Sequence, residues 1–382
     1  MKLMMITQDF PPETGGIQTY SLCHARVLAG KCDRFGVICP DHPDAAAIDN
    51  TLGFPVIRLK IRNDLLIVSL LRNLNRRLKE HPVDATFHSQ WQTAAAGIRA
   101  RNRGLIKQVF VAAHIRELLF NPFAAVPGLG RLFTAYRNRV LQQVDHFYPV
   151  SDYTARSLME LGVEASKITV VINGTDPQQF YPDDASGLKQ KLGLGSKKVI
   201  LTITRLVERK GLDTVLESLE KVLKKVPEAH YLVVGEGEDR QRLESIIRKN
   251  GLAGNVTFTG RVPYEELNAY YNAGDLFVMP SRTQPPDVEG FGIVFLEANA
   301  CGLPVIGSDS GGIPSAIKHG ATGFIVPEGD SGLLAERIIE LLTHSELRDR
   351  LGNEGRRRVV EEANWQSVSS KLFEDLQARL EH

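Results

Sequence analysis

The 382-residue sequence has few cysteines and no long hydrophobic run. Its four cysteines stand too far apart for a CxxC motif, and so low a count in a long chain is typical of a reduced, cytoplasmic protein. No apolar stretch approaches the ~18 residues that a membrane-spanning helix needs. The polar residues Gln8 and Asp9 follow the opening MKLMMI too soon for a signal peptide. The sequence therefore argues against a secreted disulfide scaffold and against a transmembrane protein.

A strong net charge is also missing, because 46 basic residues nearly balance 45 acidic ones to give +1. This balance provides no general attraction to nucleic acid, and we expect no nucleic-acid partner. The two parts of the chain differ, however. Residues 1–180 carry 21 Lys and Arg against 15 Asp and Glu (+6), whereas residues 181–382 carry 25 against 30 (−5). The asymmetry suggests two domains that face different partners.

Short apolar runs alternate with longer amphipathic stretches along the chain, a pattern that predicts parallel βαβ units with helices on both faces of each sheet. The predicted strands are 3–7, 35–39, 56–59, 85–87, 109–112, 147–150, 199–203, 231–234, 256–258, 276–279, 305–307 and 324–326. They form two series separated by a hinge near residues 173–185. We therefore expect an α/β protein of two doubly wound, Rossmann-like domains facing a central cleft. Ligands of such sheets bind beyond the carboxyl ends of the strands.

A Gly15-Gly16 pair follows the first predicted strand and comes just before a predicted helix. Glycines there let the backbone approach a ligand closely, and the N–H groups of a helix N-terminus favour an anion. An ordinary tight turn between strand and helix explains the pair equally well.

Several cations follow the first strand of the second series, at Arg205, Arg209 and Lys210. Cations gathered at the carboxyl end of a strand suit a diphosphate, which Arg can bind as a fork and Lys as a point charge. The alternative is a solvated basic loop. A nearby Gly235-Glu236-Gly237 resembles a dinucleotide fingerprint only superficially, because Arg240 replaces its third glycine and its acids would repel a pyrophosphate.

A glycine-flanked loop with Glu289 leads into an apolar helix that carries Glu297. A carboxylate on a buried helix costs several kcal/mol unless it is hydrogen-bonded, and sugar or ribose hydroxyls would satisfy it. The backbone N–H groups around Phe291, Gly292, Ile293 and Val294 can point at a phosphate. The alternative is a core helix whose Glu pairs with an internal Arg or Lys.

Glu289 and Glu297, with seven residues between them, resemble the E-x7-E motif of the retaining glycosyltransferases of family 4, which have the GT-B fold. The resemblance extends over essentially the whole chain. It includes Gly15-Gly16, Arg205, Lys210-Gly211, Asn173-Gly174-x-Asp176, Cys301-Gly302-Leu303-Pro304, Ser310-Gly311-Gly312 and Gly320-x-x-Gly323. In the residues of its motifs, the chain is similar to the bacterial phosphatidylinositol-mannoside mannosyltransferases.

This resemblance implies transfer of a sugar from a nucleotide-diphosphate sugar to an acceptor hydroxyl, with retention at the anomeric carbon. Arg205 and Lys210 would hold the diphosphate and stabilise the charge of the leaving group. Glu289 would bind the hydroxyls of the donor sugar, and Glu297 those of the ribose.

Three further positions take roles from the same resemblance. The Gly15-Gly16 loop would close over the phosphates, and the backbone of Val262 would read the base. His114 matches a histidine that this family places near the reactive face of the sugar, although a lone His after a strand is more often structural. The family implies an N-terminal acceptor-side domain, residues 1–176 with the C-terminal helix 366–380, and a donor-binding domain, residues 177–365.

The similarity to the mannosyltransferases favours α-mannose from GDP-mannose as the group transferred, onto a glycolipid, lipid-linked or polysaccharide acceptor. UDP-glucose or UDP-N-acetylglucosamine as donor, or a non-catalytic nucleotide-sugar-binding subunit, remain alternatives. No Asp-x-Asp motif follows a strand, so we expect no cofactor and no metal requirement.

Two stretches combine apolar and basic residues, 65–79 and 120–139. Such faces suit an anionic membrane surface, which would place the protein at the inner face of the membrane. The alternative is a core-facing helix with a solvated basic side.

Overall fold

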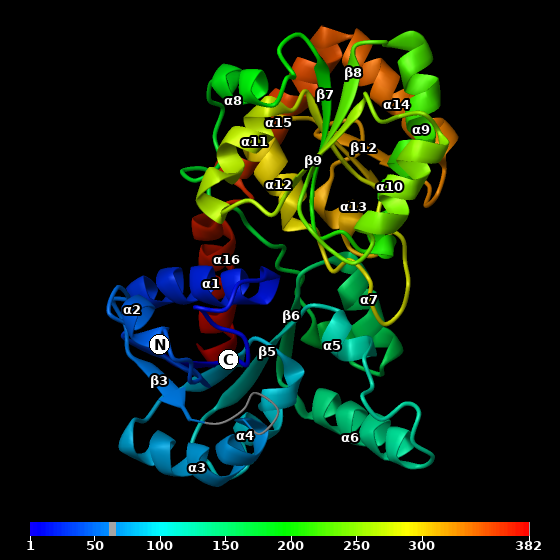
Figure 1. The fold of residues 1–382 in the computed structure, drawn as a ribbon. Coiled ribbons are helices and arrows are strands. Elements are labelled where there is room, and N and C mark those ends of the chain that lie inside the picture. The colour runs from blue at the N-terminus through cyan, green and yellow to red at the C-terminus, as the bar shows by residue number, and fades with distance from the viewer. Residues whose placement is uncertain (61–65, 382) are drawn as a thin grey trace. The chain divides into compact units, whose positions relative to one another are not determined.

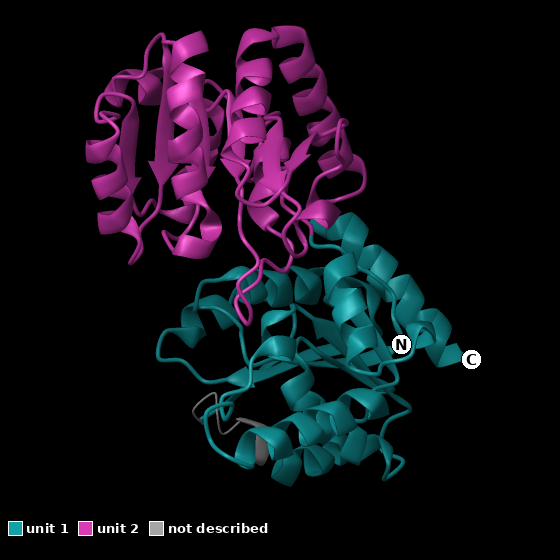
Figure 2. Cartoon of the chain, turned by 90° about the vertical axis from the view of Figure 1, so that its right-hand side faces the viewer, with its two compact units in different colours: residues 1–173, 365–382 teal, residues 174–364 magenta. Residues whose placement is uncertain are grey.

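The structure is a computed structural model that describes residues 1–60 and 66–381. The chain forms two compact units, which Figure 2 distinguishes by colour. Unit 1 comprises Met1–Asn173 and Trp365–His382, and unit 2 comprises Gly174–Asn364. The sequence predicted domain boundaries at residues 176 and 365, whereas the two units divide after residues 173 and 364. The assignment of one unit to the acceptor and the other to the donor remains a prediction.

Unit 1 is built on a six-stranded parallel sheet in the order β3-β2-β1-β4-β5-β6. Its strands are β1 (Lys2–Ile6), β2 (Arg34–Pro40), β3 (Val56–Leu59), β4 (Ala85–His88), β5 (Gln108–Ala113) and β6 (His146–Pro149). This is the strand order of a doubly wound dinucleotide-binding fold. The strands at the centre are buried along nearly their whole length, as expected of parallel strands covered on both faces.

Helices that alternate with the strands along the chain cover the sheet of unit 1 (Figure 1). They are α1 (Gly16–Lys31), α2 (Ala45–Asp49), α3 (Leu66–Glu80), α4 (Ala94–Arg101), α5 (Arg116–Leu119), α6 (Leu129–Gln143), α7 (Asp152–Glu160) and α16 (Trp365–Glu381). The last helix, α16, follows unit 2 in the chain but belongs to unit 1, where it packs against α1. Its Ser369 hydroxyl lies 2.9 Å from Nδ1 of His24 on α1, so the C-terminal helix is an integral part of unit 1.

Unit 2 repeats the same architecture, with the strand order β12-β11-β10-β7-β8-β9. Its strands are β7 (Lys198–Ile203), β8 (Ala229–Val234), β9 (Val256–Gly260), β10 (Leu276–Met279), β11 (Val305–Ser308) and β12 (Gly323–Val326). Its helices are α8 (Ser186–Lys191), α9 (Leu212–Lys225), α10 (Arg240–Lys249), α11 (Leu267–Ala273), α12 (Ile293–Ala300), α13 (Ile313–Ala316), α14 (Ser331–Thr343) and α15 (Ser345–Glu361). The carboxyl ends of β7, β8, β9 and β10 therefore lie along one edge of the sheet.

All twelve predicted strands are present, and the prediction of two doubly wound α/β sheets is confirmed. The four cysteines are free, as their spacing suggested. In the described part of the chain no helix is both long and apolar enough to cross a membrane.

The two stretches predicted to meet a membrane differ in exposure. Residue 65 and the side chains of residues 66–68 lie outside the described part of the structure. In the rest of α3, Leu70, Leu74 and Leu78 are at most 2% exposed and belong to the core of unit 1. The membrane interpretation is wrong for this part of α3, whose apolar side serves the core. The stretch 120–139, in contrast, has several exposed apolar side chains.

Candidate active site

Most of the predicted donor-binding residues lie in unit 2, beyond the carboxyl ends of β7, β9 and β10. Arg205 follows β7 and is exposed, whereas Lys210 ends the 3₁₀ helix Glu208–Lys210 (η4) and is only 9% exposed. The next residue, Gly211, caps α9 with a left-handed φ of 71°. A Cβ on Gly211 would lie 2.0 Å from the carbonyl oxygen of Pro280, just past β10. Glycine thus lets the segment with Lys210 pack directly against the end of β10.

This close packing brings Lys210 to Glu289, in the loop between β10 and α12. The Lys210 ammonium forms an ion pair with Oε2 of Glu289, and Nη1 of Arg209 lies 3.3 Å from the same oxygen. Both side chains of the Lys210–Glu289 pair are largely buried, at 11% and 14% exposure. Burial lowers the pKa of Lys210 despite the neighbouring carboxylate. Burial opposes ionisation of Glu289 too, but Lys210 and Arg209 outweigh it and lower its pKa.

The backbone of Glu289 is held from the other side by the loop after β11. The N–H of Gly312 donates to the Glu289 carbonyl oxygen at 2.8 Å. Gly311 has a φ of 52°, and a Cβ there would lie 2.4 Å from the same oxygen. The Ser310-Gly311-Gly312 motif therefore allows the close approach that positions Glu289.

Glu297 lies on α12, which begins at Ile293 after Gly292, a residue with a φ of 88°. The Glu297 side chain accepts a hydrogen bond of 2.6 Å from the Tyr271 hydroxyl on α11. Glu297 is 8% exposed, and burial raises its pKa to about 7, although the Tyr271 hydrogen bond opposes the rise. The alternative interpretation was a core helix whose glutamate pairs with an internal Arg or Lys. The described hydrogen bond to Glu297 comes instead from a neutral tyrosine. A buried carboxylate of this kind is a candidate for ligand binding.

The remaining donor-site predictions follow the same edge of the sheet. Phe291 and Gly292 are buried ahead of α12, while Ile293 and Val294 in its first turn are partly exposed. Val262 is partly exposed and follows β9 by two residues. Of the predicted donor-site side chains, the structure brings Lys210 and Glu289 into direct contact.

Two predicted sites lie in unit 1. Gly15 is extended, with φ 166°, and precedes α1, whose first residue is Gly16. His114 follows β5, and its ring packs edge-on against Tyr20 with centroids 4.6 Å apart. Burial lowers the pKa of His114 to about 4, so its imidazole is neutral near pH 7. Its backbone N–H donates to Glu117 at 2.7 Å, and burial raises the pKa of that carboxyl to about 7.

Sequence reasoning missed two contacts of the site. Arg209 adjoins the predicted Lys210, so the sequence placed it nearby without indicating that it would contact Glu289. No pattern in Leu267–Ala273 marks Tyr271 as the donor to Glu297. Within residues 1–60 and 66–381, no group of three or more His, Cys, Asp or Glu side chains is placed to hold a metal ion.

Comparison with known proteins agrees with this architecture. Residues 14–179 match the description "Glycosyltransferase Family 4", and residues 185–358 match "Glycosyl transferases group 1". The chain is 31% identical to the GDP-mannose-dependent alpha-(1-6)-phosphatidylinositol monomannoside mannosyltransferase of Mycobacterium tuberculosis, over 98% of each protein. It is 32% identical to the GDP-mannose-dependent monoacylated alpha-(1-6)-phosphatidylinositol monomannoside mannosyltransferase of Corynebacterium glutamicum, over 99% of this chain and 98% of the relative.

The fold is also that of solved structures. The Anabaena protein HepE in complex with UDP superposes with a TM-score of 0.80 at 20% identity, covering 99% of this chain and 100% of HepE. The predicted GT-B fold is thus confirmed. With near full-length relatives above 30% identity, the chain belongs to glycosyltransferase family 4.

Proposed function

We propose that the protein is a retaining hexosyltransferase that transfers α-mannose from GDP-mannose to a glycolipid, lipid-linked or polysaccharide acceptor. The full-length similarity to two GDP-mannose-dependent mannosyltransferases supports the donor and the sugar. The observation that carries the proposed site is the buried Lys210–Glu289 pair beyond β7 and β10. This pair supports the proposal because it would offer a cation to a diphosphate and a carboxylate to sugar hydroxyls.

Lys210 has the chemistry to stabilise the leaving diphosphate. A buried ammonium interacts more strongly with a phosphate oxygen than an exposed one, because less water screens it. Arg205, which is exposed at the same edge, adds a second cation that a diphosphate can engage as it enters. When Lys210 turns to the diphosphate, Glu289 is released to accept hydrogen bonds from the donor sugar. Arg209, at 3.3 Å, stays beside Glu289 and keeps it ionised.

The other residues orient the donor and the acceptor. Glu297 accepts hydrogen bonds from the ribose hydroxyls, and the backbone of Val262 contacts the base. The backbone around Phe291, Gly292, Ile293 and Val294 points N–H groups at the phosphates.

For unit 1 we propose, as the family resemblance implies, that Gly15 and Gly16 would approach the phosphates with their backbone. The neutral His114 would act at the reacting face of the sugar. In this mechanism the leaving phosphate accepts the proton of the acceptor hydroxyl as the new bond forms on the same face, without a metal or cofactor.

A thermal-shift screen tests the donor assignment. GDP and GDP-mannose are compared with UDP, UDP-glucose and UDP-N-acetylglucosamine. A ligand at about 100 times its dissociation constant stabilises the folded state by ~2.7 kcal/mol. The proposal expects this shift from the guanine ligands, and a shift confined to uracil ligands would overturn it.

Lys210→Ala tests the site itself. We expect loss of mannose transfer by a factor of at least ~100, since electrostatic stabilisation of a leaving group contributes about 3 kcal/mol or more. The matched control is Lys249→Ala, which removes an exposed lysine at the end of α10 in the same unit. Transfer by Lys210→Ala at the rate of this control contradicts the assignment.

Contact with an anionic membrane surface is the second part of the proposal, and it rests on the α5–α6 apolar surface. We define this surface as Phe120, Phe123, Val126, Leu129, Leu132 and Tyr136, whose side chains are 38–68% exposed. It runs from the end of α5 into α6, at the margin of unit 1 (Figure 1). Residues 118–144 contain no acidic residue, and Arg131 and Arg139 on α6 are exposed. Exposed apolar side chains among cations suit an anionic lipid surface.

Flotation with vesicles tests this contact. Wild-type protein should bind vesicles of phosphatidylcholine with phosphatidylglycerol, and bind less at high salt because screening weakens the arginine contribution. Leu132→Glu should weaken binding by at least ~10-fold, since a buried CH₂ contributes about 0.8 kcal/mol. Met159→Glu, at a side chain 42% exposed on α7 of the same unit, is the control and should bind as wild type does. Equal losses in both variants, or no wild-type binding, would refute the contact.

A further inference from the structure

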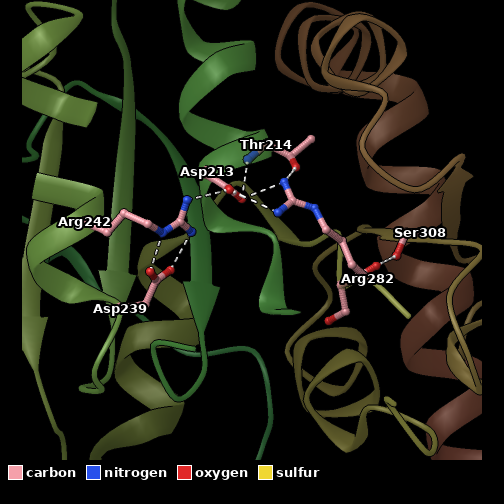
Figure 3. Close-up of polar contacts among 7 residues, drawn as sticks. Asp213, Thr214, Asp239, Arg242, Arg282 and Ser308 are labelled. Atoms are coloured by element: carbon pink, nitrogen blue, oxygen red, sulfur yellow. Dashed lines mark hydrogen bonds and ion pairs between the residues drawn. The ribbon is translucent and has the colours of Figure 1, made fainter. Parts of the chain in front are cut away.

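Four charged side chains of unit 2 form a second network, which Figure 3 shows. Its centre is Asp213, in the first turn of α9 and only 6% exposed. The Arg282 guanidinium donates to both Asp213 oxygens, at 2.8 and 3.1 Å, and Arg242 donates at 2.9 Å. Arg242 also bonds both oxygens of Asp239, at 2.5 and 2.8 Å. Two carboxylates thus balance two guanidinium groups, so the network has no net charge to attract an anion.

The network reaches both members of the ion pair through the backbone. Asp213 stands three residues after Lys210, and Arg282 stands seven residues before Glu289. The N–H of Arg282 donates to the carbonyl oxygen of Arg209 at 2.6 Å, next to Lys210. Its guanidinium also donates to the hydroxyl of Thr214 at 2.7 Å, directly after Asp213. Arg282 is therefore fastened by backbone and side chain to the segment that holds Lys210.

The residues on either side of Arg282 are fastened as well. The Ser308 hydroxyl at the end of β11 donates to the carbonyl oxygen of Ser281, a contact drawn in Figure 3. The N–H of Thr283 donates to Glu328, beyond β12, at 2.9 Å. Residues 281–283, the stem of the loop that carries Glu289, are thus tied to three different elements of the sheet edge.

We propose that Asp213 is a positioning residue for sugar transfer: by holding Arg282, it fixes the loop stem in the register that sets Glu289 against Lys210. This inference rests on the proposed function of that pair. The physical reason is that catalytic groups must be held to a fraction of an ångström, and a displacement of about 1 Å costs on the order of 100-fold in rate. Asp213 itself touches neither the donor nor the acceptor in this scheme.

Asp213→Asn tests the inference, because the amide removes the negative charge and places an N–H₂ group among guanidinium donors. The matched control is Asp275→Asn, another carboxylate of unit 2. Asp275 lies just before β10, and its carboxylate accepts a hydrogen bond of 2.6 Å from the N–H of Val199 at the amino end of β7. The ammonium of Lys189 lies 3.7 Å from the same carboxylate. We expect Asp213→Asn to lower kcat by ~10–100-fold. The variant should fold but melt below the control, because a buried carboxylate with two guanidinium partners is lost. The control should keep kcat and the donor KM within about twofold.

Combination with Glu289→Gln separates positioning from general stability. If Asp213 acts through the Lys210–Glu289 pair, Asp213→Asn has less than ~3-fold further effect on kcat in the Glu289→Gln background. Arg282→Lys gives a second route should Asp213→Asn fold poorly. A lysine keeps the charge but cannot reach both carboxylate oxygens and Thr214 together, so kcat should again fall.

Additive losses in the double variant, or losses equal to those of Asp275→Asn, overturn the inference. Failure of the proposed function has a different signature: no nucleotide sugar stabilises the wild-type protein, and Lys210→Ala transfers sugar as fast as Lys249→Ala. An active wild-type enzyme with an unaffected Asp213→Asn variant refutes the positioning role alone.

Discussion

Replacing Glu297 with Gln should make the protein more stable near neutral pH and should lower its affinity for the nucleotide-sugar donor. Glu297 is 8% exposed and has a folded-state pKa of about 7, against 4.5 for a free glutamate. The folded state therefore keeps the proton to a higher pH than the unfolded state does. Stability is lost as the pH rises from about 4.5 to about 7, and the full penalty remains above that range. Glutamine carries no charge and escapes this penalty.

The size of the effect follows from the shift. A difference of about 2.5 pKa units at 1.36 kcal/mol each amounts to ~3 kcal/mol. The glutamine carbonyl can still accept the Tyr271 hydroxyl, but its amide N–H groups are poorly satisfied, which costs about 1 kcal/mol. The net gain is ~2 kcal/mol. For a unit of this size it corresponds to a rise in melting temperature of about 4–8 °C at about pH 8. At about pH 4 the charge penalty is absent and only the ~1 kcal/mol amide cost remains, so the melting temperature should fall by about 2–4 °C.

Thermal unfolding of Glu297→Gln and wild type across this pH range measures the effect. Glu238→Gln, which removes an exposed carboxylate in the same unit, is the control and should shift melting by less than ~1 °C. Calorimetry with the nucleotide sugar should show the opposite trend. Loss of hydrogen bonds to a charged acceptor weakens binding by ~10–100-fold. A Glu297→Gln variant that melts below wild type at about pH 8, or whose shift does not depend on pH, would show that the carboxylate is structural and refute the reasoning.

Three further predictions concern the same unit. Arg205→Ala should lower kcat/KM for the donor by at least ~10-fold while changing stability by less than ~0.5 kcal/mol, because Arg205 is exposed; denaturant unfolding beside steady-state kinetics checks both. Glu289→Gln should abolish most transfer, yet leave the calorimetric affinity for GDP unchanged or up to ~10-fold tighter, since a competitor for Lys210 is removed; a large loss of GDP affinity would contradict this. Gly211→Ala should destabilise the protein by at least ~2 kcal/mol in urea unfolding, because φ is 71° and the new Cβ meets the Pro280 oxygen, whereas Gly254→Ala, with open space around it, should be nearly neutral.

The sequence predicted the sheets well because parallel strands buried on both faces appear as short continuous apolar runs. The run at 276–279 matches β10, and the glycine at 292 marks the start of α12. Helix α3 shows the limit of such patterns. A basic helix with an apolar side has the same periodicity whether that side faces a core or a lipid surface, and only the packing of Leu70 and Leu74 decides between them.

The candidate site was predictable as a location but not as a set of contacts. Lys210 and Glu289 are far apart in the chain, and the rule for parallel sheets places both at one edge without saying that they touch. Their contact depends on Gly211, whose missing side chain lets two segments close together. Tyr271 is beyond sequence reasoning for the same reason. Its hydroxyl reaches Glu297 only because α11 and α12 are brought together in three dimensions.

The two glutamates of the E-x7-E motif are stabilised in opposite ways, and in the proposed mechanism this difference shapes how a donor binds. Glu289 faces two cations, so its charge is already compensated, and a diphosphate bound as we propose would compete with it for Lys210. Glu297 has a tyrosine hydroxyl as its described donor, and burial disfavours its charged form. Ribose hydroxyls that donate to Glu297 would relieve this cost, whereas a diphosphate at Lys210 would have to break an ion pair. The affinity for the donor should therefore come largely from contacts with its nucleoside. Contacts of Lys210 with the diphosphate and of Glu289 with the sugar would replace the ion pair between these two side chains and offset its loss.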